Sequence, residues 1–148
     1  MRFNHMELTF PRGTLDDEAR TDIDAFWCGV FGWDATDVDL LGQRCHLLQP
    51  DDGQFILLAE SDTPMQSPGY DHLGLLCEGR QQVDDLLEEC RRYREKDERV
   101  RIKEYDDLPT GNVTVHAFYV KYLLPVFFDV QVLEWKPGTA PRQKWQYA

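Results

Sequence analysis

Two histidines stand at matching places in the two halves of the chain. His5 heads the run FNHMELTF at 3–10, and His72 heads the run YDHLGLLC at 70–77, just after the Pro68-Gly69 turn. A lone histidine near a strand start is usually structural. Two at corresponding positions of a repeat would instead be brought together by its symmetry, where imidazoles can bind a metal or transfer protons.

A carboxylate near the end of the chain completes this set. In the run VFFDVQVLEW at 126–135, Glu134 shares a strand face with Phe128, Val130 and Val132. A carboxylate on an apolar face is costly unless it is paired or bound to a metal. Two imidazoles and one carboxylate hold Fe(II), Mn(II), Zn(II) or Ni(II) with positions left open for substrate. The alternative interpretation leaves Glu134 in water at a frayed strand end.

The elements around His5 are well marked. Residues 3–10 alternate, with His5 on the polar face of an expected strand. A stripe of apolar residues then predicts a helix that Gly32 ends: Ile23, Phe26, Trp27, Val30 and Phe31. Three short strands follow at 36–41, 43–49 and 54–60, and the apolar run 55–59 is expected to be buried on both faces.

The second half repeats this order. We expect a strand at 71–77, a helix at 81–95 and strands near 99–105, 113–122 and 126–135. The pattern predicts an α+β fold of two βαβββ modules that form a shared curved mixed sheet, with helices outside and a cleft inside. Module 1 covers about 3–62, the linker 63–69 and module 2 about 70–135, within one domain. The tail 136–148, with Trp145 and Tyr147, either packs on a neighbouring surface or frays.

Composition narrows the class of partner. The net charge of −11 disfavours nucleic acid and anionic membranes, which need a basic footprint. The four cysteines form no C-x-x-C pair and are expected to be reduced. The sequence contains no signal-peptide pattern and no apolar run near the ~20 residues of a membrane span, so we expect a cytoplasmic protein.

Four motifs together resemble the vicinal oxygen chelate (VOC) superfamily, which includes glyoxalase I, extradiol dioxygenases, fosfomycin-resistance proteins, methylmalonyl-CoA epimerase and bleomycin-binding proteins. The motifs are N-H-M-E-L at 4–8, F-W-C-G-V-F-G-W at 26–33, P-G-Y-D-H-L-G-L at 68–75 and L-E-W at 133–135. The resemblance implies a divalent transition metal held by His5, His72 and Glu134, with Glu60 as a fourth ligand. It also implies a homodimer.

Two departures from the superfamily pattern leave alternatives open. The last strand follows Leu-Leu-Pro-Val where the superfamily usually has Asp-Pro-Asp-Gly, so Asp129 and Gln131 are alternatives to Glu134. A register shift of one residue in the strand 54–60 would put Leu57 in the ligand position and leave Glu60 on the surface.

The expected function is that of a metal-dependent enzyme whose ion chelates adjacent oxygens of a small substrate and acts as a Lewis acid. With Glu60 as ligand and base, proton transfer of the glyoxalase or epimerase kind fits. With three ligands only, an Fe(II) dioxygenase fits, with His116 or Tyr119 as the acid–base partner.

Two other functions stay open. One is a metal-free binding module of the bleomycin-resistance kind, with a cleft lined by Phe118, Phe127, Phe128 and Trp135. The other is an inactive relative whose role is dimer assembly. Three cations, Arg101, Lys103 and Lys121, either meet an anionic group or are solvated edge charges.

Overall fold

The computed structural model describes residues 3–141, so the expectations for Trp145 and Tyr147 lie outside the described residues. Its N-terminal module contains β1 His5–Pro11, α1 Asp17–Phe31, β2 Asp34–Leu40, β3 Gln43–Asp51 and β4 Gln54–Ser61. The C-terminal module contains β5 His72–Leu76, α2 Arg80–Lys96, β6 Arg101–Glu104, β7 Leu108–Thr110, β8 Val113–Lys121 and β9 Phe127–Trp135. The predicted α+β order is confirmed, with the short strand β7 as an addition.

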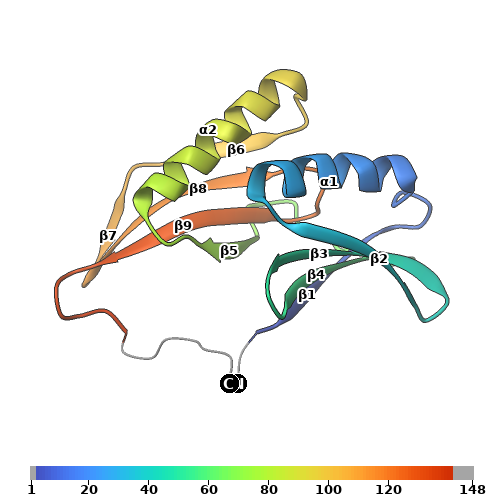
Figure 1. Ribbon diagram of the computed structural model, residues 1–148, viewed down its shortest axis with the longest axis horizontal. Helices are drawn as coiled ribbons and strands as arrows, with labels where there is room; N and C mark the ends of the chain where they lie inside the picture. Colours follow the sequence, from blue (N-terminus) through green and yellow to red (C-terminus); the bar gives the residue numbers. More distant parts are fainter. Residues whose placement is uncertain (1–2, 142–148) are drawn as a thin grey trace.

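Each module forms its own sheet (Figure 1). The strand order is β1-β4-β3-β2 in one sheet and β5-β9-β8-β6 in the other, with β7 paired to β8. In both sheets the first and last strands of the module pair in parallel, and the other pairs are antiparallel. Among the described residues no strand of one sheet pairs with a strand of the other, so the expected shared sheet is divided into two.

Local sequence signals set the ends of α1. The Asp16 carboxylate accepts a hydrogen bond of 2.8 Å from the Ala19 N–H, which satisfies one of the free donors of the first turn. Gly32 follows the helix with φ of 70°, a left-handed conformation that glycine adopts without strain, and its N–H donates to the Cys28 carbonyl.

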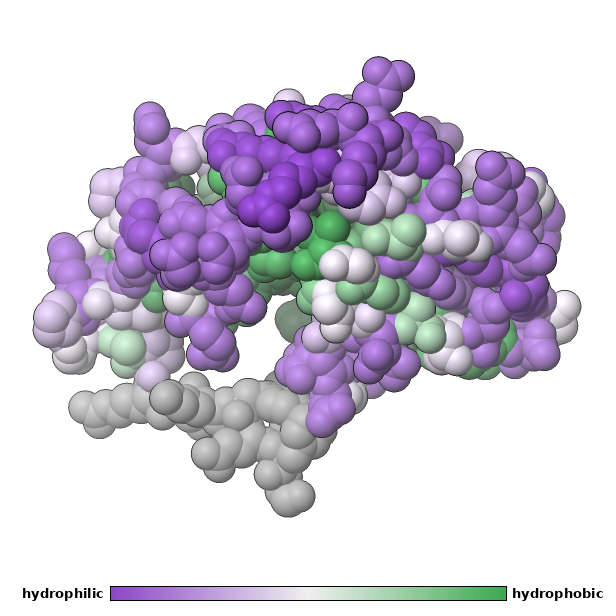
Figure 2. Space-filling view, turned by 45° about the horizontal axis from the view of Figure 1, so that its top comes forward, coloured by the Kyte–Doolittle hydropathy of each residue, from purple (hydrophilic) through white to green (hydrophobic). Residues whose placement is uncertain are grey.

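The core lies between the helices and the sheets and contains residues of both modules. The Trp27 side chain is fully buried, and its Nε1–H donates to the Tyr122 carbonyl over 3.2 Å. Its ring centroid is 4.5 Å from that of Phe128. At the surface, Arg99 donates to the Asp22 carboxylate over 2.7 Å and links the modules again. Figure 2 shows apolar surface gathered in the middle of the molecule, between hydrophilic ends.

Both helices lie on the same side of the sheets (Figure 1), so each sheet has a helix-covered face and an open face. Alternation decides which residues face the helices. On β4, Ile56 and Leu58 are buried on the helix-covered face. On the open face Ala59 is buried, whereas Phe55 and Leu57 are half-buried. The expectation that this strand is buried on both faces therefore holds at Ala59 and is wrong for Phe55 and Leu57. None of the described helices is long and apolar enough to cross a membrane.

Candidate functional site

His72 presents a ring nitrogen with an available lone pair, Nε2, on the open face of the C-terminal sheet. Its Nδ1–H donates to the Tyr70 carbonyl over 2.9 Å. Because a carbonyl only accepts, Nε2 of the neutral ring keeps its lone pair. The nearest hydroxyl to Nε2 is that of Tyr119, at 3.4 Å. Histidines that bind a metal or transfer a proton are usually fixed by such a hydrogen bond from the other nitrogen.

Asp129 lies beside His72 on the same face. The parallel pairing of β5 with β9 sets His72 opposite Phe127 and Gly74 opposite Asp129, and residues two apart in a strand share a face. The Asp129 Oδ2 atom is 4.0 Å from His72 Nε2. Its Oδ1 atom is buried and has no hydrogen-bond partner in the described part of the chain. Burial raises the pKa of this carboxyl, and the nearby imidazole acts in the opposite direction.

Tyrosine rings surround this pair. The Tyr119 ring centroid is 4.7 Å from that of His72, and the Tyr105 ring meets Tyr119 edge-on at 5.0 Å. Burial and the hydrogen bond with Tyr119 raise the pKa of Tyr105. A hydroxyl next to a free imidazole nitrogen can pass a proton to or from a bound molecule. The structure therefore brings together His72 and Tyr119, which the sequence singled out, with Asp129, its alternative to Glu134.

His5 has a parallel environment in the other module. Its Nδ1–H donates to the Asn4 side-chain oxygen over 2.9 Å, and its ring stacks on Phe55 with centroids 4.8 Å apart. His5 pairs with Phe55 as His72 pairs with Phe127. By the same register Leu57 occupies the position that Asp129 takes in the second module. His5 also lines an apolar groove of about 420 Å³ between the modules, to which Gly74 contributes from β5.

Glu134 lies on the other side of the sheet from His72. It pairs with Thr114, and its neighbour in alternation, Val132, pairs with His116 on the helix-covered face. Arg80 of α2 donates to both Glu134 carboxylate oxygens, with a distance of 3.1 Å from Nε to Oε1. This hydrogen bond lowers the pKa of Glu134. The structure thus separates Glu134 from His72, because Glu134 is offset by an odd number of positions from Phe127, which lies on the open face.

Glu60 also points toward the helices. It pairs with Phe10 and is offset by an odd number of residues from Phe55 on the open face. Its Oε1 atom accepts the Leu15 N–H over 2.9 Å. Backbone N–H groups of Leu15 and Gly13 lower the pKa of Glu60. The carboxylate therefore anchors the loop before α1, and the structure does not bring it to His5.

His116 belongs to an ion-pair cluster on the helix-covered face. Its Nδ1 atom is 2.8 Å from Asp107 and its Nε2 atom is 2.9 Å from Asp84 of α2. Arg80 also donates to Asp107. Burial disfavours the charged imidazole, but the hydrogen bonds with the two carboxylates outweigh it and raise the pKa of His116. The sheet therefore separates His116 from Tyr119, and the structure does not bring the two expected acid–base residues together.

The first module contains the same arrangement. His46 is buried, with Nδ1 2.8 Å from Asp37 and Nε2 2.7 Å from Asp24 of α1. Arg20 lies 3.5 Å from Asp37, as Arg80 lies beside Asp107. The spacing R-x₃-D within the helix and D-x₈-H across the strands occurs in both halves of the sequence. This repeat was a signal available in the sequence, and it indicates that His46 and His116 fasten each helix to its sheet.

Asp129, the sequence alternative to Glu134, is the carboxylate of β9 that lies on the open face with His72. The signal was present in the alternation of the last strand, where Phe128, Val130 and Val132 form the buried face. A residue that shares a face with them, such as Glu134, points to the helices, whereas Asp129 points away.

The donors on the open face fit part of a metal site. The His72 Nε2 lone pair and the Asp129 carboxylate, whose Oδ1 atom has no partner in the described chain, suit a divalent first-row ion. The distance of 4.0 Å between Nε2 and Oδ2 is wider than the separation of two ligands of one ion. No group of three histidine, cysteine or acidic side chains able to hold a metal occurs within residues 3–141. The predicted set of His5, His72, Glu134 and Glu60 therefore does not converge within one chain, and only a two-donor part of a site is formed.

The chain matches no family model and no curated protein sequence. It does match solved structures. One is the genomically encoded fosfomycin resistance protein FosX of Listeria monocytogenes, with 16% identity, 87% of this chain and 89% of that chain covered, and a TM-score of 0.61. Another is a putative glyoxalase family protein of Bacillus anthracis, which is 14% identical, with 90% of this chain and 96% of that chain covered and a TM-score of 0.62.

Two further matches name a reaction and a ligand. Lactoylglutathione lyase of Agrobacterium tumefaciens is 16% identical, with 88% of this chain and 92% of that chain covered and a TM-score of 0.58. A variant of the Listeria FosX, complexed with Mn(II) and 1S,2S-dihydroxypropylphosphonic acid, is 16% identical, with 87% of each chain covered and a TM-score of 0.57. At these identities the likeness shows the fold alone, which is the glyoxalase-like fold.

Proposed function

From the VOC fold that the chain shares with these structures, we propose that it is a metal-dependent enzyme acting on a small molecule with two adjacent oxygens. The observation that supports this most is the His72–Asp129 pair. It offers a free imidazole nitrogen and a buried, unpartnered carboxylate oxygen on one open sheet face. An unpaired buried carboxylate is costly, and a bound cation would offset that cost.

In this proposal each residue of the open face has a distinct role. His72 and Asp129 donate to a divalent ion, which when bound polarises substrate oxygens as a Lewis acid. The Tyr119 hydroxyl, 3.4 Å from His72 Nε2, moves a proton at the substrate atom next to those oxygens. Tyr105 packs on Tyr119 and keeps its ring in place.

We propose a homodimer as the complete unit. The outer edges of β1 and β5 are unpaired in the described chain, and unpaired edges are surfaces that other chains can extend. Half-buried Phe55 and Leu57 on the open face of the N-terminal sheet would be covered by a second copy. A third donor for the ion, His5 of the partner subunit, would then join His72 and Asp129.

A lyase or isomerase reaction with proton transfer fits the open face better than ring cleavage. The Tyr119 hydroxyl lies 3.4 Å from His72 Nε2, which supports a role in proton transfer, and lactoylglutathione lyase is among the proteins with this fold. Glu60 takes no part, since it is engaged by the loop before α1. The base that a glutamate ligand would supply is thus assigned to the tyrosine.

Metal content tests the proposal. Protein purified without added metal or chelator should contain close to one transition-metal ion per chain by elemental analysis. His72→Ala should lose it, whereas Glu60→Gln should retain it, because glutamine can still accept the Leu15 N–H. Absence of metal, together with no affinity for added Mn(II), Fe(II), Ni(II) or Zn(II), would remove the enzymatic proposal.

A binding module without metal is the second candidate, and the absence of a three-donor group within residues 3–141 favours it. Of the four aromatic residues expected to line its cleft, Phe118 and Phe128 belong to the core beneath the helices. Phe127 and Trp135 lie an even number of positions apart in β9 and share the open face. Binding of a small aromatic ligand that is unaffected by both EDTA and His72→Ala would support this candidate.

A further inference from the structure

Three cations gather on the open face of the C-terminal sheet. Arg101 pairs with Lys121, and Lys103 pairs with Tyr119, so all three side chains share the face of His72 and Asp129. Most other arginines of the described chain form ion pairs: Arg12, Arg20, Arg44, Arg80, Arg91, Arg92 and Arg99. Within residues 3–141, Arg101, Lys103 and Lys121 form none, in a protein whose net charge is −11.

Aromatic rings contact all three cations, and Lys121 Nζ also donates to the Pro125 carbonyl over 2.7 Å. No carboxylate of the described chain neutralises them. The Lys103 Nζ atom lies 3.9 Å from the centroid of the Tyr70 ring. The Arg101 guanidinium and the Lys121 Nζ atom lie 5.0 Å and 5.5 Å from the centroid of Phe127. Cation–π contacts position a positive charge without neutralising it. Burial, together with the Arg101 charge, lowers the pKa of Lys121, as expected where positive groups are collected without an anion.

The register places the cations beside the His72–Asp129 pair. His72 pairs with Phe127 and Lys121 pairs with Arg101, and Lys121 lies over the Phe127 ring, so these four residues are neighbours across the strands. In the next row lie Gly74, Asp129, Tyr119 and Lys103. Adjacent strands are about 4.8 Å apart, so Lys121 is roughly 10 Å from His72 at the backbone. A molecule of a few bonds can therefore reach both groups.

We propose that the substrate carries a negatively charged oxyanion group, which Arg101, Lys103 and Lys121 bind while its other end faces His72 and Asp129. This inference rests on the proposed function for the identity of that other end. A guanidinium and two ammonium groups match the several oxygens of a carboxylate, phosphate or phosphonate. The acidity of the rest of the chain, whose net charge is −11, disfavours a large polyanion and favours a small molecule as ligand.

Binding of two small probes in the presence of EDTA tests this subsite without any metal. Titration of ¹⁵N-labelled protein with methylphosphonate, and separately with propionate, at matched ionic strength should shift the amide signals of β6 and β8 in a saturable manner for at least one probe. The tighter probe identifies the head group as phosphonate-like or carboxylate-like.

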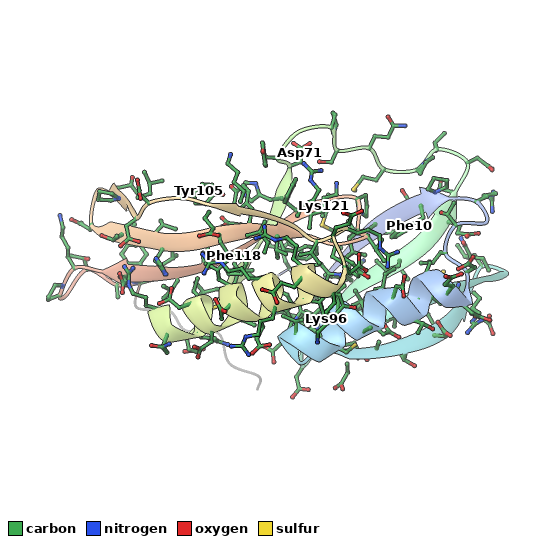
Figure 3. All side chains as sticks on the ribbon, turned by 90° about the horizontal axis from the view of Figure 1, so that it is seen from above. Phe10, Asp71, Lys96, Tyr105, Phe118 and Lys121 are labelled. Atoms are coloured by element: carbon green, nitrogen blue, oxygen red, sulfur yellow. The ribbon has the colours of Figure 1, made fainter. Side chains whose placement is uncertain are left out.

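Variants locate the effect. Arg101→Gln and Lys103→Gln should each weaken probe binding at least fivefold, with circular dichroism spectra unchanged. Lys96→Gln is the matched control, since Lys96 is an exposed lysine on α2 (Figure 3), and it should bind as the wild type does. The inference would be overturned if Arg101→Gln and Lys103→Gln bound the probe with the affinity of the Lys96→Gln control. It would also be overturned if neither probe gave a saturable shift.

The outcomes separate this inference from the proposed function. Probe binding in EDTA that persists in His72→Ala supports the anion subsite even if the protein proves to bind no metal. Stoichiometric metal without probe binding overturns the subsite and leaves the metal proposal standing.

Discussion

Replacing Asp129 with asparagine should make the metal-free protein more stable. The Asp129 side chain is 13% exposed, and its Oδ1 atom is buried without a partner in the described chain. Leaving a buried polar group unsatisfied costs about 1–3 kcal/mol, and more when it is charged. Asparagine keeps the shape and removes the charge but still contains polar atoms. We therefore expect a gain of about 1 kcal/mol in the free energy of unfolding.

Thermal unfolding with EDTA at neutral pH measures this gain. For a chain of 148 residues, 1 kcal/mol corresponds to a rise in Tm of about 3 °C. The sign of the pH dependence follows from the raised pKa of Asp129. A group with a raised folded-state pKa favours folding at low pH, and that contribution is lost as the pH rises through the folded-state pKa. The advantage of Asp129→Asn should therefore vanish toward pH 3 and appear as the pH rises.

An exposed aspartate of the same module provides the control. Asp106 is exposed and precedes β7, so Asp106→Asn should change stability by less than about 0.5 kcal/mol. If Asp129→Asn were no more stable than the wild type at neutral pH in EDTA, the view of Asp129 as a costly unpaired carboxylate would be refuted.

Three further predictions concern the surroundings of the site. His116 has a raised pKa, so its contribution to the stability of the fold should be greatest below its ordinary pKa of 6.5 and be lost as the pH rises. Urea unfolding of wild type and His116→Asn from about pH 5 to 9 measures this contribution, and a stability difference that is constant with pH would contradict the prediction. Trp27→Ala removes a fully buried indole that packs across the modules. It should lower the free energy of unfolding, measured in urea, by about 3–5 kcal/mol. A decrease below about 1 kcal/mol would argue against a core shared by the two modules. Gly74→Ala would put a methyl group 2.9 Å from the Gln131 amide, the end of a flexible side chain, so its small loss of Tm should be relieved in the double variant with Gln131→Ala.

The fold was predictable because its signals are local. The apolar stripe of α1, the left-handed Gly32 and the repeated order of strands each follow from a few neighbouring residues. The two clusters around His46 and His116 also have a visible spacing repeat.

The carboxylates of the site could not be assigned as securely, because which face a residue takes depends on pairing between distant strands. Glu134 and Asp129 lie in the same strand, and only the parallel register of β5 with β9 tells which of them accompanies His72. A difference of one residue in register exchanges the two faces. Arg80, which donates hydrogen bonds to Glu134, belongs to a helix more than fifty residues earlier in the chain. No local sequence pattern predicts that contact.

The affinity for Mn(II) in metal-free wild type, Asp129→Asn and Glu134→Gln tests the central claim most directly. Both variants replace a carboxylate by an amide in β9, but on opposite faces of the sheet. The proposed site predicts that Asp129→Asn weakens Mn(II) binding by about 100-fold or more, which exceeds the usual effect of changing a residue that only supports a ligand. Glu134→Gln should bind Mn(II) within about threefold of the wild-type affinity. Loss of binding in Glu134→Gln with full binding in Asp129→Asn would contradict it.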